Sequence, residues 1–122
     1  LYIAEGEPDH DHVRELRAYP IDGDGSLGNH SVLHTFGADH RGPQRGIEGM
    51  CLDADGNIVA CGGWAKNGPG PLIYVFSPAG RLLKTYDLLA DMPNRCAFGG
   101  PDMATLYVTT ATGELLAGKA AG

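Results

Sequence analysis

The fold is decided by residues 50–61, which read Met50-Cys51-Leu52-Asp53-Ala54-Asp55-Gly56-Asn57-Ile58-Val59-Ala60-Cys61. Two short apolar runs flank a turn of polar residues and glycine. Glycine accepts the positive φ that a tight turn between strands requires, and β-branched residues favour strands. The stretch therefore predicts an antiparallel hairpin.

The second strand of this hairpin recurs along the chain. Similar strand cores occupy residues 1–4, 57–60 and 106–109, and they begin 56 and then 49 residues apart. After each of the first two cores, a further pair of apolar runs flanks a turn, at residues 22–25 and 79–80. Four antiparallel strands in a repeat of about 40–50 residues are typical of a β-propeller blade.

Composition narrows the class of protein. The 122 residues have a net charge of −6, and 43% of them are hydrophobic. This acidic balance argues against a nucleic-acid partner, which would require a basic face. No apolar run approaches the roughly 18 residues that a membrane-spanning helix needs. No segment shows a convincing apolar period of 3.6 residues, so we expect an all-β fold.

The three cysteines, Cys51, Cys61 and Cys96, are too few and too odd in number for a disulfide framework. They form no C-x-x-C pair, so they predict neither a structural zinc site nor a redox motif of that kind. Each lies in an apolar run. We expect three small buried side chains.

The length of the chain suggests an incomplete ring. At about 45 residues per blade, residues 1–122 supply about two and a half blades, whereas propellers close with about four to eight. We expect the chain to be the C-terminal portion of a single propeller domain whose N-terminal blades lie outside it. The alternative is a ring closed by several copies. In either case one copy does not close a propeller by itself.

The block Arg45-Gly46-Ile47-Glu48-Gly49-Met50-Cys51-Leu52-Asp53-Ala54-Asp55-Gly56-Asn57, followed by Ala60-Cys61, resembles the SMP-30/gluconolactonase family. Cys96-Ala97-Phe98-Gly99-Gly100-Pro101-Asp102, followed by Leu106-Tyr107-Val108-Thr109-Thr110, resembles the next blade of the same family. The resemblance implies a six-bladed propeller that binds a divalent metal in its central channel and hydrolyses sugar lactones.

Glu48 maps to the family's metal-binding and catalytic acid, which is usually Asp. The implied cation is Ca²⁺, or another divalent cation such as Zn²⁺, Mg²⁺ or Mn²⁺. A hard cation such as Ca²⁺ takes carboxylate oxygens, and a bound metal polarises the lactone carbonyl and helps to deprotonate water. The longer Glu side chain suits a flexible calcium site better than a proton transfer. The alternative is an exposed loop glutamate.

Three further residues are candidates for substrate binding. Relatives often carry Thr-Asn directly before the cysteine at position 96, whereas here Asn94 is one place earlier and Arg95 precedes the cysteine. In a regular strand a shift of one residue exchanges the two faces. Arg95 could bind a carboxylate or phosphate of a substrate bidentately, or be a solvated cation. Trp64 could stack on a sugar ring at the channel mouth, or pack between blades.

The sequence thus predicts metal-dependent hydrolysis of a lactone, such as gluconolactone, in the channel of a β-propeller. The expected partners are a small-molecule lactone and the remaining blades of the parent chain, with neither nucleic acid nor membrane. Two alternatives stay open. One is a non-catalytic propeller that serves as a binding platform, and the other is a related organophosphate hydrolase.

Overall fold

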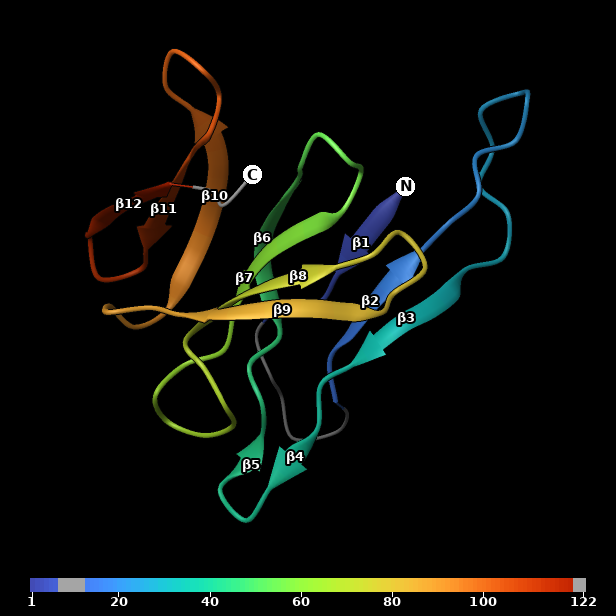
Figure 1. Ribbon diagram of the computed structural model, residues 1–122. Helices are drawn as coiled ribbons and strands as arrows, with labels where there is room; N and C mark the ends of the chain where they lie inside the picture. The colour runs from blue at the N-terminus through green and yellow to red at the C-terminus, as the bar shows by residue number, and fades with distance from the viewer. Residues whose placement is uncertain (7–12, 120–122) are drawn as a thin grey trace.

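The computed structural model describes residues 1–6 and 13–119, and all regular structure in these ranges is β (Figure 1). No described helix is long and apolar enough to cross a membrane. The described strands form three antiparallel sheets and one short hairpin. The first sheet contains β1 (Tyr2–Ala4), β2 (Glu15–Ala18) and β3 (Ser31–Thr35). The second contains β6 (Ile47–Leu52), β7 (Ile58–Gly62), β8 (Leu72–Phe76) and β9 (Leu82–Asp87). The third contains β10 (Pro93–Gly99), β11 (Thr105–Thr110) and β12 (Leu115–Lys119).

The repeat expected from the sequence is confirmed. The three similar strand cores form β1, β7 and β11, and each pairs antiparallel with the strand that follows it. β6 and β7 make the hairpin of residues 50–61, with its turn at Gly56 in the left-handed region. The three sheets lie side by side in chain order, as blades do, and they do not close into a ring (Figure 1).

The second sheet packs against the first and third sheets through its two apolar faces. Residues of β7 and β8 alternate between the faces, as a strand period of two requires. One face packs against the first sheet in a core of Leu16, Phe36, Ile47, Ile58, Ala60, Leu72, Tyr74 and Phe76. The other face packs against the third sheet through Val59, Cys61, Ile73 and Val108. All five residues of β7 are buried, which explains its unbroken apolar run.

Two connections differ from the expectation. Residues 22–25 do form a tight turn, in which the Asp22 carbonyl accepts a hydrogen bond from the Gly25 amide, but the strands they join end at Ala18 and resume at Ser31. The connection is longer because Pro20 cannot donate to a strand ladder. A second hairpin, β4 (Ala38–Asp39) and β5 (Gly42–Pro43), joins the first two sheets and was not predicted.

Backbone bulges at equivalent places interrupt the first strands of two sheets. In β6 the register shifts between Ile47 and Gly49, so Glu48 is the extra residue. In β10 it shifts between Pro93 and Arg95, so Asn94 is the extra residue. A bulged residue stands outside the regular alternation of faces. The face exchange inferred for Asn94 from a one-residue shift therefore does not apply to this strand.

The two bulges pack on each other at Gly49. A Cβ atom there would lie 2.3 Å from the Asn94 carbonyl oxygen and 3.0 Å from the Arg95 Cα. Both contacts are with backbone, which cannot rotate away. Only glycine allows β6 and β10 to come this close.

We predict that Gly49→Ala destabilises the protein, because the methyl group pushes the two strands apart. Overpacking of this kind costs about 1–3 kcal/mol. Urea denaturation of the full-length protein measures the change in the free energy of unfolding. Gly118→Ala in β12 is the matched control, since a Cβ there meets nothing within 4 Å. Equal stability of the two variants would contradict the close packing of β6 on β10.

Candidate functional site

The Arg45 side chain lies at the centre of the candidate site and is only 2% exposed. Its Nη1 donates hydrogen bonds to the carbonyl oxygens of Gly63, at 2.9 Å, and Pro93, at 3.1 Å. Its Nη2 lies 3.9 Å from Oε1 of Glu48. A buried guanidinium remains charged, so it must be compensated by acceptors and by an anion. Arg45 thereby joins the start of β6, the loop after β7 and the start of β10.

Glu48 stands at the bulge of β6 with a partly buried side chain. Its carboxylate packs against Gly6, where a Cβ atom would lie 2.2 Å from Oε1. The neighbouring backbone of the two sheets is tied together, because the Gly46 amide donates to the Gly6 carbonyl at 2.8 Å. The acid is thus placed where the first and second sheets meet.

Arg95 and Asn94 lie at the bulge of β10, beside the bulge that carries Glu48. Nη1 of Arg95 donates to the backbone carbonyl oxygens of Glu48, at 2.8 Å, and Asn94, at 2.6 Å. The Asn94 Oδ1 accepts a hydrogen bond from the Thr109 hydroxyl at 2.7 Å. Arg95 is exposed, yet it is a bridge between the two bulges and not simply a solvated loop cation.

Trp64 lies in the loop between β7 and β8, directly after the Gly63 carbonyl that binds Arg45. Its indole N–H donates to Oδ1 of Asn67 at 2.8 Å, and the ammonium of Lys66 lies 5.2 Å from the ring centroid. Asn67 is buried and donates from Nδ2 to the carbonyl oxygens of Gly42 and Pro43. The loop is therefore anchored to the β4–β5 hairpin.

The structure brings the sequence candidates to one end of the molecule. The Glu48 acid, the Asn94–Arg95 bulge and the loop of Trp64 all adjoin the Arg45 guanidinium through direct contacts or neighbouring residues. Sequence reasoning quoted Arg45 within the family motif but gave it no role. Its burial depends on carbonyl groups at positions 63 and 93, which no local pattern reveals.

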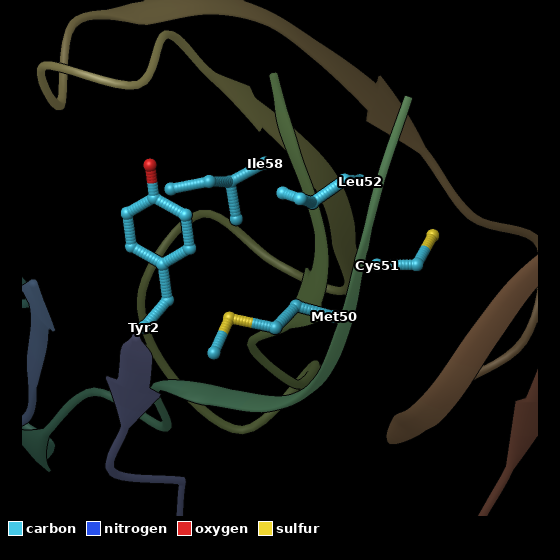
Figure 2. A pocket seen from close by; sticks show the side chains of 5 residues that line it. All are labelled: Tyr2, Met50, Cys51, Leu52 and Ile58. Carbon is cyan, nitrogen blue, oxygen red and sulfur yellow. The ribbon is translucent and has the colours of Figure 1, made fainter. Parts of the chain in front are cut away.

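A cavity lies between β6 and β1 (Figure 2). It has a volume of about 190 Å³ and is lined by Tyr2, Met50, Cys51, Leu52 and Ile58. Its lining is mostly apolar and provides no carboxylate. The cavity separates two blades and lacks the groups that lactone chemistry requires.

The family model described as the SMP-30/Gluconolactonase/LRE-like region matches residues 10–112. The chain belongs to this family. Membership confirms the resemblance that the blocks at residues 45–57 and 96–110 carry.

Curated relatives agree with the family assignment. The chain is 36% identical over 88 residues to regucalcin of Xenopus laevis, covering 71% of this chain and 26% of that protein. It is 33% identical over 95 residues to 6-deoxy-6-sulfogluconolactonase of Pseudomonas putida, covering 78% and 30% respectively. It is 34% identical over 67 residues to pentonolactonase XacC of Haloferax volcanii, covering 55% and 21%. The chain thus spans less than a third of the length of these relatives.

A solved structure of a luciferin-regenerating enzyme superposes with a TM-score of 0.64 at 29% identity. The match covers 80% of this chain and 30% of that one. That enzyme is a β-propeller, so the sheets of this SMP-30/gluconolactonase/LRE-like chain are propeller blades. The all-β fold and the blade architecture expected from the sequence are confirmed.

We predict that Arg45→Met lowers the free energy of unfolding by about 3 kcal/mol, because two buried carbonyl groups lose a charged donor. Chemical denaturation of the full-length protein measures this loss. Arg41→Met is the matched control, since Arg41 forms an exposed ion pair with Asp39 and such pairs contribute little. If both variants were as stable as the wild type, Arg45 would not hold the three segments together.

Proposed function

We propose that the protein to which this chain belongs hydrolyses lactones, and that Glu48 is a functional acid of its site. One observation carries the proposal. The Glu48 carboxylate stands at the bulge of the first strand of a blade, where two sheets meet and the buried Arg45 guanidinium lies beside it. The names of two relatives, a sulfogluconolactonase and a pentonolactonase, support the reaction class.

The oxygen atoms at this end of the molecule supply only some of the ligands that a hard divalent cation needs. Glu48 offers carboxylate oxygens, and the three thiols lie farther along the strands, between the second and third sheets. Among the described residues no three or more His, Cys, Asp and Glu side chains are arranged to hold a metal ion. Glu48 would therefore supply one ligand of a calcium site, and oxygen atoms from other parts of the protein and water would supply the rest. Such a cation, when bound, acts as a Lewis acid on the lactone carbonyl.

The chain's own residues have distinct tasks in this proposal. Glu48 places a negative charge at the reacting centre, and Arg45 fixes its position from the buried side. Arg95 presents a guanidinium beside it, with Nη1 already bonded to two backbone carbonyls. Trp64, in its anchored loop, borders one side of the space in which the substrate would bind. Positioning of this kind lowers the barrier because the groups need not reorganise during the reaction.

Arg95 favours lactones that carry an anionic group. Its guanidinium is exposed, and a planar guanidinium matches the geometry of a carboxylate, sulfonate or phosphate. The same feature keeps organophosphate hydrolysis as the second candidate activity. A binding platform without catalysis is the third possibility, and it is an outcome of the experiment below.

We predict that Glu48→Gln, which keeps the size of the side chain and removes its charge, weakens calcium binding about tenfold and slows lactone hydrolysis roughly 100-fold. Isothermal calorimetry and a pH-indicator assay on the full-length protein measure the two effects. Asp102→Asn is the control, because Asp102 is an exposed acid paired with Lys119 in the third sheet.

The two readouts separate the possible roles of Glu48. Weaker binding together with a slower rate supports a ligand that also serves catalysis. A slower rate with unchanged affinity would assign Glu48 to proton transfer alone. Wild-type affinity and wild-type rate would remove Glu48 from the site, and no hydrolysis by the wild-type protein of any lactone tested would favour the binding platform.

Arg95→Met should raise KM about tenfold for a lactone with a carboxylate or sulfonate group, since a charge-assisted hydrogen bond is lost. KM for a neutral sugar lactone should change much less. Steady-state kinetics with the two substrates on the same variant provide the comparison. An equal change for both substrates would show that Arg95 supports the bulges and does not read the substrate's charge.

A further inference from the structure

The three cysteines of the chain gather between the second and third sheets. Cys51 lies on β6, Cys61 on β7 and Cys96 on β10. The Sγ atoms of Cys51 and Cys96 are 3.7 Å apart, and both side chains are half-buried free thiols. Figure 2 shows Cys51 turned away from Tyr2, Met50 and Ile58, toward the ribbon of β10.

We propose that Cys51 and Cys96 form a modification site, at which a hydroperoxide converts the two thiols into a disulfide that cross-links two blades. A disulfide requires an Sγ–Sγ distance of about 2.05 Å, so side-chain rotation must close the 3.7 Å separation by about 1.6 Å. Strands β6 and β10 already pack at Gly49, where no side chain separates them. The proposal is independent of lactone hydrolysis.

Solvent access distinguishes the reacting pair from the third cysteine, because Cys51 and Cys96 are half-buried. Cys61 is fully buried, and its thiol donates to the Gly49 carbonyl within its own sheet at 3.2 Å. The Cys96 thiol interacts with Cys51, and this hydrogen bond lowers the pKa of the Cys51 thiol. The interactions with Cys51 and Cys61 raise the pKa of Cys96, and the contact with Cys96 also lowers the pKa of the buried Cys61 thiol. The thiolate is the nucleophile and the Cys61 side chain is closed off from solvent, so Cys51 is the residue that attacks the oxidant.

The reaction balances with hydrogen peroxide as the oxidant. The Cys51 thiolate attacks one peroxide oxygen, so an S–O bond forms, the O–O bond breaks and the other oxygen leaves as water after protonation. The Cys96 sulfur then attacks the sulfenic sulfur of Cys51, the S–S bond forms and the S–O bond breaks. The hydroxyl group of the sulfenic acid takes up the Cys96 thiol proton and leaves as the second water. Two thiols lose two electrons, and one peroxide gains them.

The cross-link would join positions 45 residues apart in the sequence. Closing a loop of this size restricts the unfolded chain and therefore stabilises the folded one. It would also fix β6 to β10 three residues after Glu48 and two residues after Asn94. The two bulges would then keep their packed arrangement.

Peptide mapping of the full-length protein tests the proposal. The protein is treated with one equivalent of hydrogen peroxide, alkylated and cleaved before aspartate, which puts Cys51, Cys61 and Cys96 on peptides 39–52, 55–86 and 91–101. We expect peptides 39–52 and 91–101 to be joined. The free-thiol content should fall by two per chain, the thermal midpoint should rise by several degrees and dithiothreitol should reverse both changes.

Variants and competing products decide the outcome. Cys61→Ala should still form the cross-link, whereas Cys51→Ser and Cys96→Ser should not. If a serine variant fails to fold, the wild-type peptide map still identifies the pair. A link to peptide 55–86, a link between two chains, or sulfinic acid at unlinked cysteines would each overturn the proposal.

Discussion

The buried guanidinium of Arg45 is the interaction on which the candidate site depends. A charge that is removed from water is tolerated only if acceptors and an anion surround it. Here the acceptors are the carbonyl oxygens of Gly63 and Pro93, and the Glu48 carboxylate is at 3.9 Å. These partners come from three separate segments of two blades. Because the buried Arg45 guanidinium needs these partners, it fixes the positions of Glu48, the Trp64 loop and the start of β10.

Glycine makes this arrangement possible because it lets backbones come close. A Cβ at Gly46 would lie 2.3 Å from the Glu5 carbonyl oxygen, and a Cβ at Gly49 would lie equally close to the Asn94 carbonyl oxygen. The first contact packs the second sheet on the first, and the other packs it on the third. The two apolar faces of the central sheet supply most of the burial. The packing of the three blades therefore determines where the residues of the candidate site lie.

The sequence predicted the blades well, because their signals are local. The short apolar runs on either side of the turn at Gly56 indicate a hairpin without reference to distant residues. The site was predicted in composition but not in arrangement. Glu48, Asn94, Arg95 and Trp64 were named from the family motif and its neighbourhood. Neither the bulge at Asn94 nor the bridge from Arg95 to the Glu48 carbonyl could be read from the sequence.

The remaining differences share a physical cause. Arg45 is buried by groups 18 and 48 positions away, and an arginine is usually a surface residue. Cys51 and Cys96 were expected to be small buried side chains, but they are only half-buried, and their thiols face each other because β6 and β10 come into contact. Contacts between blades decide both features. A repeat pattern in the sequence predicts the strands within a blade but not the contacts between neighbouring blades.

A crystal structure of the full-length protein grown with calcium would test the roles of Glu48 and Arg45 most directly. A Glu48 carboxylate oxygen should lie within about 2.3–2.6 Å of the cation. The Arg45 guanidinium should remain on the carbonyl oxygens of Gly63 and Pro93. A cation bound away from Glu48, with Arg45 turned to solvent, would contradict the central claim.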